Sequence, residues 1–357
     1  MRRTEASLDL AALRHNLQSL RELAPNSRVM AVIKANGYGH GLERVARTLT
    51  DTDALGVACI EEAVKLREAG ISTPITLLEG FFYADEIPLI NQHKLDLVIH
   101  HVQQIEILEQ QPLSAPLRVW LKVDSGMHRL GIRADEVRTQ WQRLAVISSV
   151  EVVGVMTHLA NADDLNDAAT ERQLELFRES CDGLSGERTI ANSAGILGWP
   201  QSHADWNRPG ISLYGISPFI GGRGEQHGLR PVMTLRSELI AVNQLKRGDA
   251  IGYGGSWCCP EDMAVGVVAV GYGDGYPRHA KMGTPVLLNG KRVPLVGRVS
   301  MDMITVDLRQ QPGAHIGDEV VLWGEGLPVE EIAECAATIP YELLCGVTSR
   351  VHFVERG

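Results

Sequence analysis

Several features that point directly to common protein classes are missing from this sequence. No uninterrupted apolar run reaches about 18 residues, so we expect no membrane-spanning helix and no membrane partner. No CxxC pair and no cysteine–histidine spacing typical of a metal site is present, so we expect no metal. The cysteines, which we expect to be free thiols, are Cys59, Cys181, Cys258, Cys259, Cys335 and Cys345.

Positive charge is also scarce. Lysine and arginine number 34 against 44 aspartates and glutamates, a net charge of −10, and no basic tract is present. This balance argues against a nucleic-acid partner. The two arginines near the start are not followed by an apolar run, so the pattern of a secretory signal is absent and we expect a cytoplasmic protein. A length of 357 residues favours two domains.

The first 220 or so residues alternate between short β-branched runs and stretches with helical spacing. The expected strands are 28–34, 54–59, 74–78, 95–100, 117–124, 152–159, 189–193 and one near 206–213. The expected helices include 41–49, 60–68, 102–111 and 168–181. Eight such repeats predict a (β/α)8 TIM barrel. A doubly wound open sheet is the alternative, although no GxGxxG follows the first strand.

The pattern changes after residue 220, where a glycine-rich polar stretch resembles a linker. The runs that follow are rich in valine, leucine and isoleucine, and helical spacing returns only at 329–337. The expected strands are 234–242, 264–270, 285–288, 293–296, 303–306 and 319–322. We therefore predict two domains, a barrel over 1–228 and a mostly-β domain with one late helix over 229–357.

Lys34 is the last residue of an apolar expected strand. In a TIM barrel, the carboxyl ends of the strands carry the catalytic groups. A buried ammonium is costly unless it is paired or deprotonated, and Schiff-base chemistry uses desolvated lysines. Lys34 alone is equally compatible with a lysine that is simply exposed at the strand end. The loop after it, 35–41, contains three glycines and Tyr38, which suits an approach to a phosphate. Barrels also bind phosphate with the loops after strands 7 and 8, which here hold Ser193, Gly210 and Ile211.

Seven segments of the chain resemble the alanine racemase family, and they occur in the family's order. They are 31–41, 121–131, 192–193, 208–215, 252–254, 271–278 and 297–303. The first is similar to the family's pyridoxal-phosphate attachment signature around Lys34. The resemblance implies a pyridoxal-phosphate-dependent isomerase that interconverts L- and D-alanine, either supplying D-alanine for peptidoglycan or allowing alanine catabolism.

The resemblance also implies a two-base mechanism and a homodimer with shared active sites. Lys34 would hold the cofactor and act as the base on one face, and Tyr253 of the partner chain would act on the opposite face. Racemisation needs both, because one group removes the α-proton and another returns a proton from the other side. A hydrogen-bonded chain from Tyr253 through His158 to Arg208 would activate the tyrosine. Arg208 would face the cofactor's ring nitrogen.

Further roles follow from the same resemblance. Arg129 would bind the substrate carboxylate, assisted by the backbone of Met301. Lys122 would carry a carbamate that orients Arg129; an ordinary lysine paired to an acid is the alternative. The cofactor would also contact Tyr38, Ser193, Gly210 and Ile211. The substrate access channel would include Tyr272, Arg278, Arg298 and Asp302.

Three positions depart from the family pattern. Gly37 stands where alanine is usual, Ser349 where some members place a tyrosine on the phosphate, and His352 where proline is usual. Two other functions are less compatible with this sequence. Related barrel-plus-β decarboxylases place an acid where Arg208 stands, and pyridoxal-phosphate carrier proteins are generally single barrels without a domain that would hold Tyr253.

Overall fold

The computed structural model describes residues 3–110 and 115–357, which form two compact units. The barrel unit comprises Arg14–Leu213 and Ser217–Gly222. The β unit comprises the segment that ends at Leu13 together with Tyr214–Ile216 and Arg223–Gly357. The boundary expected between residues 228 and 229 remains a prediction.

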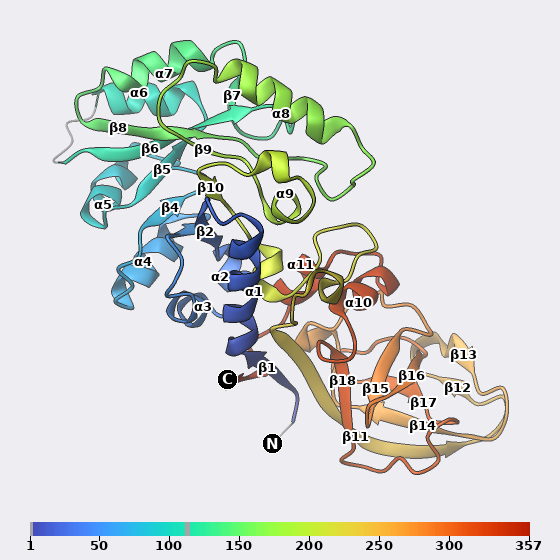
Figure 1. Ribbon diagram of the computed structural model, residues 1–357. Helices are drawn as coiled ribbons and strands as arrows, with labels where there is room; N and C mark the ends of the chain where they lie inside the picture. The colour runs from blue at the N-terminus through green and yellow to red at the C-terminus, as the bar shows by residue number, and fades with distance from the viewer. Residues whose placement is uncertain (1–2, 111–114) are drawn as a thin grey trace. The chain divides into compact units, whose positions relative to one another are not determined.

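The barrel unit is built on a closed parallel sheet (Figure 1). Its strands in chain order are β2 (Arg28–Val32), β3 (Ala54–Val57), β4 (Ile75–Leu77), β5 (Asp96–Ile99), β6 (Leu117–Asp124), β8 (Val150–Met156), β9 (Glu187–Thr189) and β10 (Trp206–Asn207). Each pairs in parallel with its neighbours, β10 pairs with β2, and β5 pairs with β6, which closes the ring. A short strand, β7 (Ile132–Arg133), pairs in parallel with β6. The predicted (β/α)8 barrel is confirmed, and the open-sheet alternative is wrong.

Helices follow most of these strands, as parallel connections require. They are α3 (Leu42–Thr48), α4 (Ile60–Glu68), α5 (Ile87–Gln92), α6 (Val102–Gln110), α7 (Val137–Ala145), α8 (Ala169–Ser180) and α9 (Ser193–Gly198). In α8 the buried residues Thr170, Gln173, Leu174 and Phe177 recur at helical spacing, so one face packs inward. Of the expected helix 102–111, Gln111 lies outside the described residues.

The barrel interior is apolar. One buried cluster collects side chains from several strands: Met30, Ala54, Val98, Trp120, Val153, Met156 and Trp206. The rings of Trp120 and Trp206 meet edge to face, with centroids 6.3 Å apart and an interplanar angle of 88°. Two large aromatic side chains therefore fill the centre of the barrel, which is a packed core rather than a pore.

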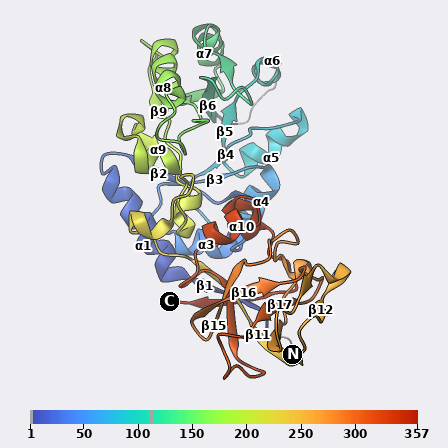
Figure 2. The same ribbon diagram turned by 90° about the vertical axis from the view of Figure 1, so that its right-hand side faces the viewer.

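The β unit contains an eight-stranded sheet in the order β14-β17-β16-β15-β18-β11-β1-β19, and β14 also pairs with β11 (Figure 2). The strands are β1 (Glu5–Asp9), β11 (Met233–Leu245), β14 (Met263–Val268), β15 (Pro285–Leu288), β16 (Lys291–Val296), β17 (Ile304–Asp307), β18 (Glu319–Trp323) and β19 (His352–Arg356). The long strand β11 pairs with β1, β14 and β18. Its pairing with β14 has a register shift between Leu239 and Ala241.

Two features of the β unit differ from the sequence expectation. It contains two late helices, α10 (Val329–Cys335) and α11 (Pro340–Cys345), where one was expected. Strand β1, near the start of the chain, pairs antiparallel with β11 and parallel with β19. A separate hairpin is formed by β12 (Ala250–Ile251) and β13 (Trp257–Cys258).

Candidate active site

The candidate site lies one layer above the apolar core of the barrel. Side chains alternate between the two faces of a strand, so a residue two positions after a core residue points to the same side. Three predicted site residues stand in that relation to the buried cluster: Lys122 follows Trp120, His158 follows Met156, and Arg208 follows Trp206. Lys34 stands four positions after Met30. The strand pattern thus directs three basic side chains to the carboxyl end of the barrel, and Lys34, just beyond the end of β2, lies close enough for its charge to act on Lys122 and His158.

Lys34 begins a turn with unusual backbone geometry. The next four residues, Ala35 to Tyr38, all have positive φ angles of 53°, 54°, 63° and 50°. Such left-handed turns are costly for residues other than glycine, so surrounding contacts must hold this one. The Gly37 amide donates to the Ile33 carbonyl at 2.8 Å, and the Asn36 side chain accepts from the Leu42 amide at 3.0 Å. The turn therefore fixes both Lys34 and Tyr38.

Arg208 is buried among neutral oxygen atoms. Its Nη1 donates to Thr189 Oγ1 at 2.6 Å, and its Nη2 donates to the carbonyl oxygens of Thr157 and Ile190. Burial lowers the pKa of Arg208 to about 10, which still leaves the guanidinium positive at neutral pH. These three acceptors hold the planar group at the carboxyl ends of β8 and β9.

Lys122 and His158 share this cationic environment. Burial, followed by the positive charges of Arg208, Arg129 and Lys34, lowers the pKa of Lys122 to about 8, and Glu79 acts in the opposite direction. Burial is also the largest cause that lowers the pKa of His158 well below its ordinary value, followed by the charge of Arg208. The imidazole of His158 is therefore neutral at physiological pH.

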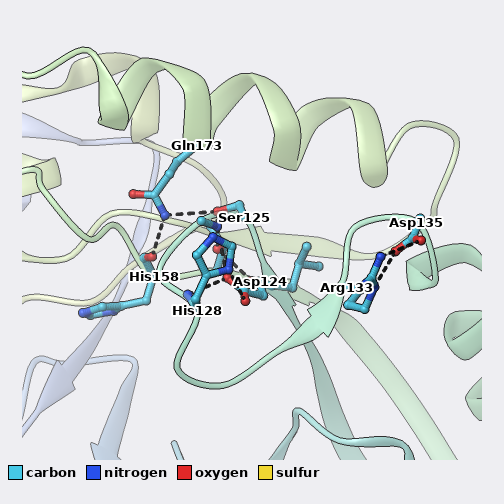
Figure 3. A network of polar contacts seen from close by, with 10 residues as sticks. Asp124, Ser125, His128, Arg133, Asp135, His158 and Gln173 are labelled. Carbon is cyan, nitrogen blue, oxygen red and sulfur yellow. Dashed lines mark hydrogen bonds and ion pairs between the residues drawn. The ribbon is translucent and has the colours of Figure 1, made fainter.

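Arg129 is exposed and lies on the loop between β6 and β7. The start of this loop is anchored by Asp124 (Figure 3). Asp124 accepts from the Gly126 and His128 amides, each at 3.0 Å, and contacts His128 Nδ1 at 3.0 Å. Gln173 of α8 donates to the His158 carbonyl at 3.2 Å and to Ser125 at 3.4 Å. The loops after β6 and β8 are thus tied together, and the His158 side chain points away from Gln173 (Figure 3).

A group of hydrogen-bonding atoms gathers at the loops after β9 and β10. The Ser193 hydroxyl accepts from the Gly210 amide at 2.9 Å and from the Ser212 amide at 3.3 Å. Gly210 also lies against Tyr38, because a Cβ carbon at residue 210 would lie 2.6 Å from the Tyr38 hydroxyl oxygen. The residues predicted to contact a phosphate, including Ile211 next to Gly210, are therefore brought together in the barrel unit.

The remaining predicted residues lie in loops of the β unit. Tyr253 is in the turn between β12 and β13, where Gly252 and Gly254 have φ angles of 67° and 74° that favour glycine. Its side chain is 68% exposed, and those of Tyr272 and Met301 are 39% and 52% exposed. Arg278 and Arg298 are exposed and Asp302 is half-buried. The side chains of Tyr253, Tyr272 and Met301 are therefore accessible at the surface of the described chain.

Two residues at the carboxyl end of the barrel strands were not predicted from the sequence. Glu79 follows β4 and is the carboxylate that acts on Lys122. His100 follows Val98 of the core cluster by two positions, and its Nε2 contacts the Glu79 carbonyl oxygen at 3.0 Å. His100 closes an expected strand, so the rule that identified the other strand-end residues applies to it equally.

Within the described part of the chain, no group of three or more His, Cys, Asp or Glu side chains is arranged to hold a metal ion. The same residues include no helix that is long and apolar enough to cross a membrane.

Comparisons with known proteins cover both units. Residues 8–218 match the family described as "Alanine racemase, N-terminal domain", and residues 232–355 match "Alanine racemase, C-terminal domain". The chain is 51% identical to an alanine racemase of Coxiella burnetii, with 99% of each chain covered. It is 55% identical to a biosynthetic alanine racemase of Escherichia coli, with 95% of each covered. A crystal structure of biosynthetic alanine racemase from Pseudomonas aeruginosa superposes with a TM-score of 0.98 at 45% identity, with 100% of both chains covered.

Proposed function

This chain belongs to the alanine racemase family, and from that premise we propose that it interconverts L-alanine and D-alanine with pyridoxal phosphate held on Lys34. The observation that carries the proposal is the convergence of Lys34, Lys122, His158 and Arg208 above one apolar cluster of the barrel. D-alanine would be the product used for peptidoglycan, and the reverse reaction would allow alanine catabolism.

The residues present fit the cofactor. A phosphate ester needs several hydrogen-bond donors, and the Tyr38 and Ser193 hydroxyls meet at Gly210, whose lack of a side chain leaves room for close approach. The neighbouring groups carry an excess of positive charge that suits an anionic ligand. Bound pyridoxal phosphate supplies an electrophilic carbonyl and an electron-withdrawing ring that acidifies the α-hydrogen of an amino acid.

Lys34 and Tyr253 are the proposed proton-transfer groups. Lys34 would remove or return the α-proton on one face of the substrate, and Tyr253 of a second copy of the chain would act on the other. The exposure of Tyr253 in its hairpin turn supports a role across a dimer. A neutral His158 is able to accept a hydrogen bond from the tyrosine hydroxyl, as the proposed chain from Tyr253 to Arg208 requires.

Arg208 is proposed to donate a hydrogen bond to the ring nitrogen. Its three acceptors are neutral oxygen atoms, so none of them offsets the positive charge of the guanidinium. A guanidinium at neutral pH donates a hydrogen bond but gives up its proton reluctantly. The ring would then withdraw electrons less strongly than one protonated through a carboxylate, which favours return of the proton to Cα.

Arg129 and the Met301 backbone are proposed to bind the substrate carboxylate. Lys122 is proposed to carry a carbamate, and its lowered pKa supports this because a neutral amine is the form that reacts with carbon dioxide. A carbamate anion would also offset the surrounding positive charge and orient Arg129. Tyr272, Arg278, Arg298 and Asp302 are proposed to line the substrate access channel across the dimer.

The proposal is tested by purifying the protein without added cofactor, recording its visible absorption spectrum and assaying D-alanine formation from L-alanine. We expect a visible band of bound cofactor and racemase activity, both lost in Lys34→Ala. Lys65→Ala is the matched control, because Lys65 lies on α4 and its partner is the surface residue Glu43 at 4.0 Å. Absence of the band and of D-alanine in the wild type, or full activity in Lys34→Ala, would contradict the proposal.

A further inference from the structure

Three glycines in the segment 271–275 allow close backbone contacts in the β unit. A Cβ carbon at Gly271 would lie 2.3 Å from the Ser300 carbonyl oxygen, and one at Gly275 would lie 2.3 Å from the Gly346 carbonyl oxygen. A Cβ carbon at Gly273 would lie 2.3 Å from Arg350 Nη1. The contacts at Gly271 and Gly275 are with backbone oxygen atoms, so glycine is required at both positions, whereas the contact at Gly273 shows how closely the Arg350 side chain packs on this segment.

Hydrogen bonds join this segment to the loop that contains Met301. The Tyr272 amide donates to the Ser300 carbonyl at 3.0 Å, and the Gly273 amide donates to the Met301 carbonyl at 2.9 Å. On the other side, Thr348 Oγ1 donates to the Gly273 carbonyl at 2.9 Å. Backbone around Tyr272 is therefore held between the Met301 loop and the segment that leads to Arg350.

Arg350 connects the two loops through their carboxylates. Its Nη2 donates to Asp302, beside Met301, and its Nε lies 3.4 Å from Asp274 Oδ1. Asp274 is fully buried, and its other oxygen accepts from the Gly271 amide at 2.9 Å. We call Arg350, Asp274 and Asp302 the Arg350 clamp.

Most exposed ion pairs contribute little to stability, but the Arg350 clamp includes the Asp274 carboxylate, which has no contact with solvent. Loss of the guanidinium would remove one partner of a buried carboxylate, which would destabilise the 271–275 segment in its present position. A lysine cannot replace the arginine fully, because one ammonium does not reproduce the planar fork that reaches two carboxylates.

We propose that Arg350 is a positioning residue that holds Tyr272 and Met301 in place for the active site of a second copy of the chain. This inference rests on the proposed function, in which the loops of one copy complete the site of the other. Tyr272 and Met301 extend from the clamped backbone with partly exposed side chains. Displacing their loops would weaken substrate binding more than it would slow proton transfer.

Hybrid dimers provide the test. A mixture of Lys34→Ala and Tyr253→Phe chains gives hybrid dimers with one intact site, made from Lys34 of the Tyr253→Phe chain and Tyr253 of the Lys34→Ala chain. Recovery of activity in this mixture supports the shared site. Failure to recover activity there counts against the proposed function rather than against the role of Arg350.

Arg350→Met is then added to one parent or to the other. On the Lys34→Ala chain, which supplies the Tyr253 face, it should raise KM for alanine about tenfold with a smaller change in kcat. On the Tyr253→Phe chain it should leave KM unchanged. Both hybrids contain the same substitutions, so a general loss of stability affects them equally. Equal KM values, or a rise in the second arrangement, would overturn the inference.

Two further variants keep the result interpretable. Arg350→Lys should give a smaller rise in KM and serves if Arg350→Met does not fold. Arg292→Met is the matched control, because Arg292 forms a two-pronged ion pair with Glu331 at 2.5 and 2.9 Å outside the Arg350 clamp. It should leave KM and kcat at wild-type values. A rise in KM in Arg292→Met equal to that in Arg350→Met would overturn the inference.

Discussion

Gly210 and Tyr38 come from opposite ends of the barrel sequence, yet a Cβ carbon at residue 210 would lie 2.6 Å from the Tyr38 hydroxyl oxygen. The tyrosine ring is held by the left-handed turn after Lys34, and the Gly210 amide is held by Ser193 at 2.9 Å. Neither partner is free to move without disturbing the other atoms proposed to bind phosphate.

Gly210→Ala should therefore weaken cofactor binding. The added methyl group displaces the Tyr38 hydroxyl, and we expect the dissociation constant for pyridoxal phosphate to rise roughly tenfold, equivalent to about 1.4 kcal/mol. Titration of the apoprotein, followed by visible absorbance, measures it. Gly313→Ala is the control, because a Cβ carbon there has no atom within 4 Å. Equal affinity of Gly210→Ala and the wild type would show that Tyr38 does not hold the phosphate.

Gly37→Ala should destabilise the turn after Lys34. Gly37 has a φ angle of 63°, and a Cβ carbon there would lie 2.9 Å from Val45 Cγ2. We expect the free energy of unfolding to fall by about 1–2 kcal/mol, since a left-handed conformation disfavours alanine. Adding Val45→Ala to Gly37→Ala should recover only the part of the lost free energy of unfolding that the contact between the new Cβ carbon and Val45 causes. A neutral effect of Gly37→Ala would mean that the turn differs from the one described.

Thr189→Val tests how Arg208 is held. The substitution removes the hydroxyl that accepts from Arg208 Nη1 at 2.6 Å and keeps the side-chain volume. We expect kcat to fall severalfold, because one hydrogen bond to a charged group is lost. The cofactor should stay bound. Thr284→Val is matched, because Thr284 is equally buried and its hydroxyl donates to the Lys281 carbonyl at 2.6 Å. A similar loss of kcat in both variants would rule out a specific effect through Arg208.

His158 should make stability depend on pH. In the unfolded chain a histidine takes up a proton near pH 6.5, whereas burial keeps native His158 neutral to lower pH. Below pH 6.5 the unfolded state thus binds one more proton, so the free energy of unfolding falls as pH falls, by up to about 1.4 kcal/mol per pH unit. His158→Gln should lose this component in denaturation curves between pH 6.5 and 5. An unchanged slope would mean that native His158 is protonated.

The barrel and most of its strand-end residues were predictable because they depend on local patterns. Alternation along a strand places Lys122 above Trp120 and Arg208 above Trp206 regardless of the rest of the fold. The roles of Tyr253 and Met301 came from the family resemblance alone, since nothing near them in the sequence marks exposed loop residues as functional.

Features that depend on contacts between distant segments were not predictable. Strand β1 pairs with β11 across more than 220 residues, and no local signal specifies that partner. The turn from Ala35 to Tyr38 places three non-glycine residues at positive φ, which propensities disfavour. Arg350 lies one residue after Ser349 and two residues before His352, the two nearby positions that depart from the family pattern. Its ion pair with Asp274 nevertheless appears only in the folded structure, because the two residues are far apart in the sequence.

The central claim is that Lys34 and Tyr253 act on opposite faces of the substrate. It is tested most directly by measuring exchange of the α-hydrogen of L-alanine and of D-alanine separately in deuterated water. In Tyr253→Phe, exchange should persist for one enantiomer and be lost for the other, because only one of the two proton-transfer groups remains. Exchange of both enantiomers at wild-type rates in this variant would contradict the two-base account.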